Sequence, residues 1–154
     1  QTIRQLSLRD PLTGLANRRF LHENERLMIA GAKRSEKQMA VLAVDLDEFK
    51  AVNDRYGHAA GDAVLQVAAE RMKQLLRESD VIVRLVAGRV VDSLRQPIPL
   101  ATGGSARIGA SVGIALCCAD GETLDELLKK ADAALYAAKR DGRNTYREAA
   151  ASGA

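Results

Sequence analysis

The feature that most constrains the fold is a short apolar run, residues 39–44, which ends in two acids and continues directly into a polar loop. The run predicts a buried strand. Side chains alternate along a strand, so Asp45 and Asp47 should lie on one face and the residues between and before them on the other. Since Mg²⁺ prefers oxygen ligands and completes its shell with substrate phosphates, the acid pair indicates phosphate chemistry. The ordinary structural alternative is a solvated strand end.

Length and composition predict one globular domain with its own core. The chain has 154 residues, of which 47% are hydrophobic and 28% charged, and its formal net charge of +3 includes no long basic block. Trp is absent and aromatic residues make up 3%. The concentrated basic face and the stacking platforms typical of nucleic-acid binding are therefore missing. We expect a small anionic ligand and no nucleic acid polymer as partner.

Two adjacent cysteines, Cys117 and Cys118, fall on a predicted strand, so their side chains should face opposite ways and cannot form an ordinary disulfide. They are typical of a reducing compartment. No apolar run is long enough to span a bilayer, and no secretory signal stands at the start of the sequence. We expect a cytoplasmic domain, alone or as part of a membrane-anchored sensor protein.

The pattern of apolar residues predicts a mixture of helices and strands, an α/β class of fold. Helical spacing is found in four segments and strand-like spacing in two more, namely residues 17–34, 62–76, 87–94 and 124–140 for the helices and residues 81–85 and 107–117 for the strands. Gly103 and Gly104 predict a hairpin turn. We expect residues 1–9 to be the end of a linker or signalling helix, residues 10–148 the domain itself and residues 149–154 a tail.

Four segments, taken in order along the chain, resemble the motifs of one family, the GGDEF domain of diguanylate cyclases. They are DPLTGLANRR at residues 10–19, DLDEFK with the following ND, GH and GD pairs at residues 45–62, RESD with a later Arg at residues 77–84, and LYAAKRDGRN at residues 135–144. The resemblance implies an α+β domain in which helices flank a central, mostly antiparallel sheet, the palm-like fold shared with adenylyl cyclases.

The same resemblance implies an activity and its partners. Two GTP molecules would be condensed into cyclic di-GMP with Mg²⁺ or Mn²⁺, and two domains would have to meet face to face as a homodimer, each holding one GTP. An upstream sensor domain in the full-length protein is a further implication of the family.

Carried over to this sequence, the resemblance implies that Asp45 binds the metal ions, with the backbone carbonyl of Leu46 as a further ligand. Asn53 and Asp62 would recognise guanine. A carboxylate accepts from the guanine N–H groups, and an amide both donates and accepts, so the residue types suit the base. The ordinary alternative for Asp62 is an N-cap of the helix that follows it.

Lys139 and Arg143 would hold the triphosphate. Because they stand four residues apart at a predicted helix end, we expect them to share one face and to reach one anion. Without the resemblance, the commoner explanation would be a favourable interaction of two cations with the helix dipole.

The sequence departs from the family after Arg84 and Leu85. Where the signature hairpin should supply two glycines and the acid that completes the metal site, the chain reads Val86-Ala87-Gly88-Arg89-Val90. The catalytic acids are thus unidentified. Either a mobile segment has been omitted between Leu85 and Ala87, which the intact spacing of the other motifs favours, or the protein lacks it. In the first case we expect an active cyclase and in the second an inactive one.

A competing hypothesis is a regulatory module without turnover. Arg77 and Asp80 would then capture cyclic di-GMP, the arginine reaching guanine or phosphate and the acid accepting from guanine N–H groups. The structural alternative for this pair is an exposed turn between helix and strand. A third hypothesis is a dimerisation module that binds neither nucleotide.

Overall fold

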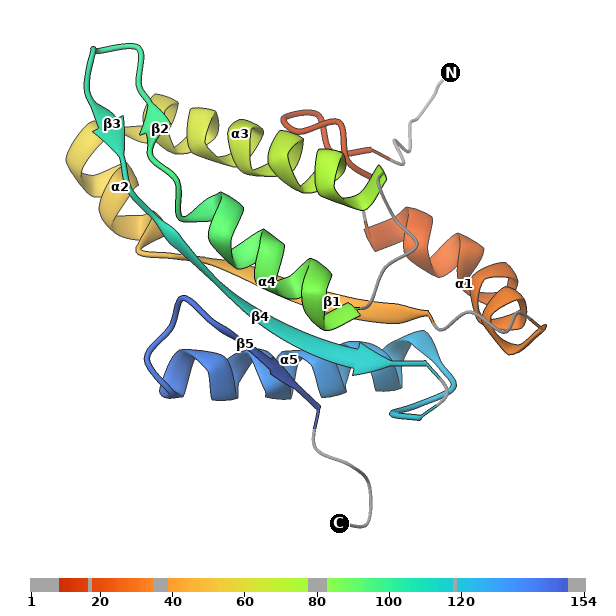
Figure 1. Cartoon of the computed structure of the whole chain (residues 1–154). Coiled ribbons are helices and arrows are strands. Elements are labelled where there is room, and N and C mark those ends of the chain that lie inside the picture. Colours follow the sequence, from red (N-terminus) through yellow and green to blue (C-terminus); the bar gives the residue numbers. More distant parts are fainter. Residues whose placement is uncertain (1–8, 17, 35–38, 78–82, 118, 150–154) are drawn as a thin grey trace, which may run out of the picture.

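The helices and strands alternate irregularly along the chain (Figure 1). The structure is a computed structural model, and it describes residues 9–16, 18–34, 39–77, 83–117 and 119–149. Its elements, in chain order, are α1 (Arg18–Arg34), β1 (Ala40–Asp47), α2 (Phe49–Tyr56), α3 (His58–Arg77), α4 (Val83–Leu94), β2 (Ile98–Pro99), β3 (Ser105–Ala106), β4 (Gly109–Leu116), α5 (Leu124–Arg140) and β5 (Tyr146–Glu148).

The main sheet has the strand order β1-β4-β5. Strand β1 pairs with β4 in antiparallel fashion along its whole length, from Ala40 opposite Leu116 to Asp47 opposite Gly109. Strand β5 adds to the other edge of β4 in parallel. A separate short hairpin joins β2 and β3, and its turn, which includes Gly103 at φ 99°, confirms the predicted hairpin turn. The mixed α+β architecture is as predicted.

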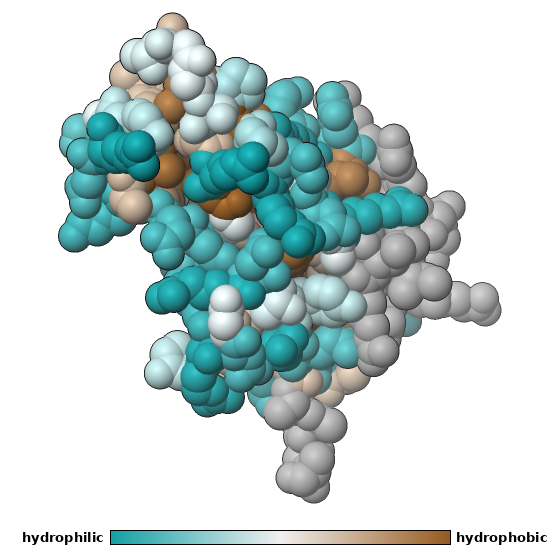
Figure 2. Space-filling model, turned by 60° about the vertical axis from the view of Figure 1, so that its left-hand side comes forward, coloured by the Kyte–Doolittle hydropathy of each residue, from teal (hydrophilic) through white to brown (hydrophobic). Residues whose placement is uncertain are grey.

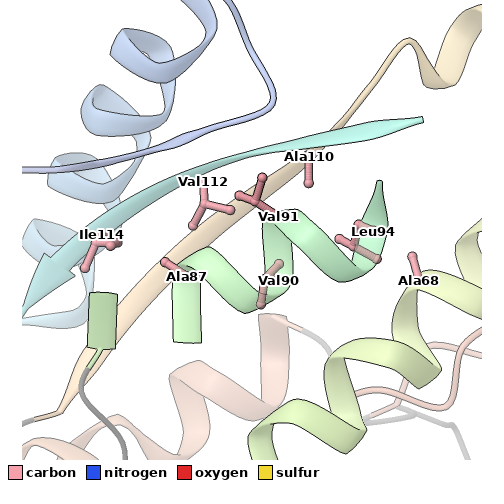
Figure 3. Close-up of a cluster of buried hydrophobic side chains, with 8 residues drawn as sticks. All are labelled: Ala68, Ala87, Val90, Val91, Leu94, Ala110, Val112 and Ile114. Atoms are coloured by element: carbon pink, nitrogen blue, oxygen red, sulfur yellow. The ribbon is translucent and has the colours of Figure 1, made fainter. Parts of the chain in front are cut away.

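Helices cover both faces of the main sheet (Figure 1). Helix α5 packs on one face against β1 and β4, and α4, backed by α3, packs on the other. Figure 3 shows the second layer, in which Ala87, Val90, Val91 and Leu94 of α4 lie against the side chains of β4, with Ala68 of α3 beside them. Successive side chains of β1 therefore pack on opposite faces of the sheet. Val41 and Ala43 join the apolar cluster under α5, whereas Leu42 and Val44 join the cluster under α4.

Helix α5 matches its predicted bounds, residues 124–140. Thr123 caps it by accepting a hydrogen bond from the Glu126 N–H, and the Glu126 carboxylate in turn accepts from the Thr123 hydroxyl. The helix lies unusually close to β4 at Gly113, where a Cβ atom would come within 2.0 Å of the Ala131 carbonyl oxygen. A residue without a side chain is required at this crossing.

The prediction of a strand at residues 81–85 is wrong for residues 83–85. Residues 81 and 82 lie outside the described part of the chain, and Val83–Leu94 forms one continuous helix, α4. Leu85 and Ala87 both lie within this helix. The physical reason is the spacing of Val83, Ala87, Val90 and Leu94, which recur at the period of a helix once the family's hairpin is missing.

Helix α3 begins at His58, four residues before its predicted start. Residues 1–8 and 150–154 lie outside the described part, so the expected linker helix and tail stay predictions. Among the described helices, none combines the length and the apolar character that crossing a membrane requires. The face shown in Figure 2 is largely hydrophilic, with small apolar areas between polar side chains.

Candidate functional site

Asp45 and Asp47 lie on the same face of β1, the face covered by α5. Asp45, which is partly exposed, forms an ion pair with the ammonium group of Lys139 in the last turn of α5. The register of the sheet sets Asp45 opposite Ser111 of β4. The structure thus brings together the predicted metal ligand and one of the two predicted phosphate ligands, although they are far apart in the sequence.

Asp47 has a different environment, since its side chain is only 7% exposed. One carboxylate oxygen accepts a hydrogen bond from the Ser111 hydroxyl at 2.7 Å, and the other accepts from the backbone N–H of Asn144 at 2.8 Å. Sequence reasoning did not assign this role to Asp47, Ser111 or Asn144. The one available signal was a polar Ser111 in the otherwise apolar run of β4.

The second predicted phosphate ligand, Arg143, is not on the helix. Helix α5 ends at Arg140, with Asp141 as its C-cap, and Gly142, Arg143 and Asn144 follow with φ values of 117°, 65° and 50°. The prediction that Lys139 and Arg143 share a helix face is therefore wrong. The chain turns away after Arg140, and the backbone N–H of Arg143 is held by the Ala138 carbonyl at 3.0 Å.

The two residues predicted to read guanine lie on neighbouring helices. Asn53 is on α2, and its side chain occupies the space beside Gly61, where a Cβ would come within 1.7 Å of the Asn53 Oδ1. Asp62 follows Gly61 on α3 and is exposed. Because α3 begins at His58, Asp62 lies within the helix and is not its N-cap. The two side chains thus flank the start of one helix.

The pair predicted to bind cyclic di-GMP can be placed only in part. Arg77 is the last residue of α3, and Asp80 lies outside the described residues.

The donor set at Asp45 suits a metal that is shared with a phosphate ligand. In the described ranges, no three His, Cys, Asp or Glu side chains gather in a group that could hold a metal ion by themselves. Both oxygens of Asp47 are already engaged, which leaves the Asp45 carboxylate, with Lys139 as its present partner. Mg²⁺ is commonly held by one or two carboxylates together with substrate phosphates, so a single carboxylate fits that mode of binding.

The fold and the Asp45–Lys139 corner together define an α+β domain in which an acid at a strand end meets a lysine at a helix end. A model of the family described as "Diguanylate cyclase, GGDEF domain" matches residues 7–91 and 85–145. The chain belongs to this family.

Curated relatives agree with the family. The chain is 42% identical to the bifunctional diguanylate cyclase/cyclic di-GMP phosphodiesterase MucR of Pseudomonas aeruginosa, in a match that covers 92% of this chain and 23% of the relative. It is 37% identical to the diguanylate cyclase TpbB of the same organism, in a match that covers 90% of this chain and 36% of the relative. The chain therefore spans only about a quarter to a third of these two proteins.

Solved structures of the family have the same fold. The GGDEF domain of TpbB superposes with a TM-score of 0.84 at 36% identity, over 92% of this chain and 94% of that one. The GGDEF domain of DgcB from Caulobacter crescentus, solved in complex with c-di-GMP, gives a TM-score of 0.80 at 27% identity, over 96% of this chain and 98% of that one.

The comparisons also bear on the region around Leu85. The match with MucR extends over 161 aligned positions and includes 92% of the 154 residues, about 142, so about 19 positions of the relative have no counterpart here. The two ranges matched by the family model overlap at residues 85–91. These residues lie within α4, at the point where the sequence departs from the family's signature hairpin.

Proposed function

We propose that this domain is of the diguanylate-cyclase type. Its site holds GTP with a divalent metal ion, and two such domains placed face to face condense two GTP molecules into cyclic di-GMP. The observation that supports this most is the ion pair between Asp45 and Lys139. It brings an oxygen of the kind that binds metals and a cation of the kind that binds phosphates to one corner, as a metal-bound triphosphate requires.

The residues at the Asp45–Lys139 corner would each bind a different part of the metal–GTP complex. Asp45 and the backbone carbonyl of Leu46 would hold Mg²⁺ or Mn²⁺, which when bound neutralises charge on the phosphate oxygens. Lys139 would exchange its contact with Asp45 for contacts with the triphosphate. The exposed Arg143 would add a planar guanidinium, whose paired donors match phosphate oxygens.

The base would bind at the junction of α2 and α3. Asn53 lies against Gly61, so its amide is held beside the exposed Asp62. An acid that accepts from two guanine N–H groups, next to an amide that can donate to a ring acceptor, favours guanine over adenine. Close contact with Gly61 requires that this position carry no side chain.

Condensation depends on one further part of the family's site. The signature hairpin supplies the acid that completes the metal site, and this chain continues from Leu85 into α4 instead. We therefore propose that the 154-residue chain binds GTP and metal, and that it joins two GTP molecules only when the missing segment is supplied.

Binding can be tested by calorimetry with GTP and Mg²⁺. We expect Lys139→Gln to weaken GTP binding by about 10- to 100-fold, because a hydrogen bond to a charged group is worth about 1.5–3 kcal/mol. Lys129→Gln is the matched control, since Lys129 is an exposed lysine on the same helix, away from Asp45. Equal losses in the two variants, or no GTP binding by the wild type, would contradict the proposal.

Turnover can be tested by restoring the segment. A variant that carries, between Leu85 and Val86, the roughly 20 residues of MucR without a counterpart in this chain should form cyclic di-GMP from GTP and Mg²⁺. The parent protein, with an intact mass near 16.6 kDa, should not. In the restored variant, Asp45→Ala should abolish product formation and leave the circular dichroism spectrum unchanged. A folded, GTP-binding restored variant without product, or one whose product formation survives Asp45→Ala, would argue against the assignment.

The purely regulatory module, with cyclic di-GMP held by Arg77 and Asp80, is less favoured, because curated relatives are named as cyclases. Its support is the complex of the DgcB domain with c-di-GMP. Calorimetry with cyclic di-GMP on the wild type and on Arg77→Ala separates the two, and equal affinities would remove the regulatory site.

The proposal extends to the cellular location of the domain, its dimerisation and its control by another domain. The chain matches only 23% of MucR and 36% of TpbB, and one family structure was solved in complex with a protein named as its activator. We propose that this domain acts in the cytoplasm, as a homodimer during catalysis and under the control of an upstream sensor domain.

A further inference from the structure

Asp47, a buried acid two residues after the proposed metal ligand Asp45, has no role in the proposed function. Asp47 is 7% exposed, and burying a carboxylate is costly unless its oxygens are hydrogen-bonded. Both oxygens are, one to the Ser111 hydroxyl of β4 and one to the backbone N–H of Asn144, which lies 97 residues further along the chain. Asp47 therefore ties the end of β1 to the segment that follows α5.

That segment has an unusual backbone. Gly142, Arg143 and Asn144 are three consecutive residues with positive φ, and two of them carry side chains. Such conformations cost free energy and persist only where surrounding contacts impose them. The Arg143 N–H bonds to the Ala138 carbonyl, and the Asn144 N–H bonds to Asp47. The loop is thus held at one end by the helix it leaves and at the other by the strand β1.

A glycine on the neighbouring strand leaves room for the contact between Asp47 and Asn144. At Gly109, the partner of Asp47 in the sheet, a Cβ atom would lie 2.9 Å from the Asn144 Oδ1 and 3.2 Å from the Asp47 Oδ2. The absent side chain lets the loop approach the carboxylate. Because Asp45 lies on the same face two residues earlier and contacts Lys139, the loop is held beside the Asp45–Lys139 pair.

We propose that Asp47 is a positioning residue for the triphosphate: its carboxylate fixes the left-handed loop 142–144 and thereby places Arg143 at the phosphate corner. This inference rests on the proposed function for its ligand. Asp47 is only 7% exposed and both its oxygens accept hydrogen bonds from the protein, so we assign its carboxylate to the loop and not to the metal or the nucleotide. Its effect on binding passes through Arg143.

Three substitutions separate positioning from mere burial. Asp47→Ala leaves the Asn144 N–H without its acceptor. Asp47→Asn keeps an acceptor for that N–H, because the Ser111 hydroxyl can rotate to accept from the new amide. Ser111→Ala removes one buried hydrogen bond of Asp47 and leaves the bond to the loop in place. We expect loop function to be lost in the first variant and retained in the other two.

The first readout is amide hydrogen exchange of the Asn144 N–H, which needs no ligand. We expect at least about 10-fold faster exchange in Asp47→Ala than in the wild type, in line with the loss of a hydrogen bond to a charged acceptor. Asp47→Asn and Ser111→Ala should stay close to the wild type. Unchanged exchange in a folded Asp47→Ala protein would overturn the proposal, as would equal acceleration in Ser111→Ala. Should Asp47→Ala not fold, fast Asn144 exchange in the folded Asp47→Asn protein would overturn it.

The second readout is a double-mutant cycle on GTP affinity in the presence of Mg²⁺. If Asp47 acts through Arg143, Asp47→Ala and Arg143→Gln should each weaken binding by about 10-fold, and the double variant by no more than the larger single loss. Guanosine affinity should be unchanged in all three. Multiplied losses in the double variant, or an equal loss for guanosine, would overturn the proposal. A wild type that does not bind GTP would refute the proposed function instead, and the exchange experiment would then decide whether Asp47 holds the loop.

Discussion

Two acids of one strand, separated by one residue, differ in almost every physical respect. Asp45 is partly exposed and paired with a lysine ammonium, whereas Asp47 is buried and bonded to a hydroxyl and a backbone N–H. The alternation of a strand predicts that they share a face. Nothing local to the strand predicts their partners, because Asn144 and Lys139 reach them only after the whole domain has folded.

A residue-scale prediction concerns Asp10 in the opening motif. The carboxylate accepts hydrogen bonds from the backbone N–H and the hydroxyl of Thr13, each at 2.9 Å. These bonds, the backbone one first, hold the pKa of Asp10 below its ordinary value. Since the pKa is lower in the folded than in the unfolded chain, the turn stabilises the fold above the unfolded-state pKa, and this contribution is lost as the pH falls through the lowered pKa.

Thr13→Ala should therefore raise the pKa of Asp10 only part of the way, because the backbone N–H remains as a donor. Thr13→Ser, which keeps the hydroxyl, should leave the pKa low. An NMR titration of the Asp10 carboxyl group measures both. An unchanged pKa in Thr13→Ala would show that the hydroxyl contributes nothing.

At the scale of elements, the crossing of α5 and β4 depends on one glycine. A Cβ at Gly113 would meet the Ala131 carbonyl oxygen at 2.0 Å and the Leu135 backbone nitrogen at 2.3 Å, and neither atom can move without shifting the helix. We expect Gly113→Ala to lower the free energy of unfolding by at least about 1–3 kcal/mol, the usual cost of overpacking.

Gly31 supplies the matched control for that prediction. It lies inside α1, and a Cβ there would have no neighbouring atom within 4 Å. Gly31→Ala should raise the free energy of unfolding by about 0.5–1 kcal/mol, because alanine favours the helix. Urea unfolding of the two variants gives both values, and equal effects on stability would show that the close approach at Gly113 is not limiting.

The elements that sequence patterns predicted well are those with strong local signals. Helix α5 has an N-capping threonine and a continuous apolar stripe, and its bounds are confirmed. The apolar character of residues 81–85 predicts a strand, but residues 83–85 form the start of α4. Their spacing with Ala87 and Val90 also fits a helix, and a short apolar run alone does not distinguish the two.

For the whole molecule, the mixed α+β fold and family membership followed from motifs spread over the chain. The geometry of the site did not, because it depends on tertiary contacts between β1, the end of α5 and the loop before β5. The clearest example is Arg143, which sequence spacing placed on the face of Lys139 and which the structure places in a left-handed loop beyond the helix. The helix was correctly predicted to end at Arg140, so helical spacing does not extend to Arg143, and the positive φ of Arg143 depends on contacts made after the helix.

The central claim is that the corner formed by Asp45, Lys139 and the loop around Arg143 binds the triphosphate of GTP. The most direct measurement is a crystal structure of the 154-residue chain with Mg²⁺ and a non-hydrolysable GTP analogue. We predict that the phosphates lie between the Lys139 ammonium and the metal at Asp45, with the guanine against Asn53 and Asp62. A nucleotide bound elsewhere, or a corner that stays empty at saturating nucleotide with the Asp45–Lys139 pair intact, would contradict the account.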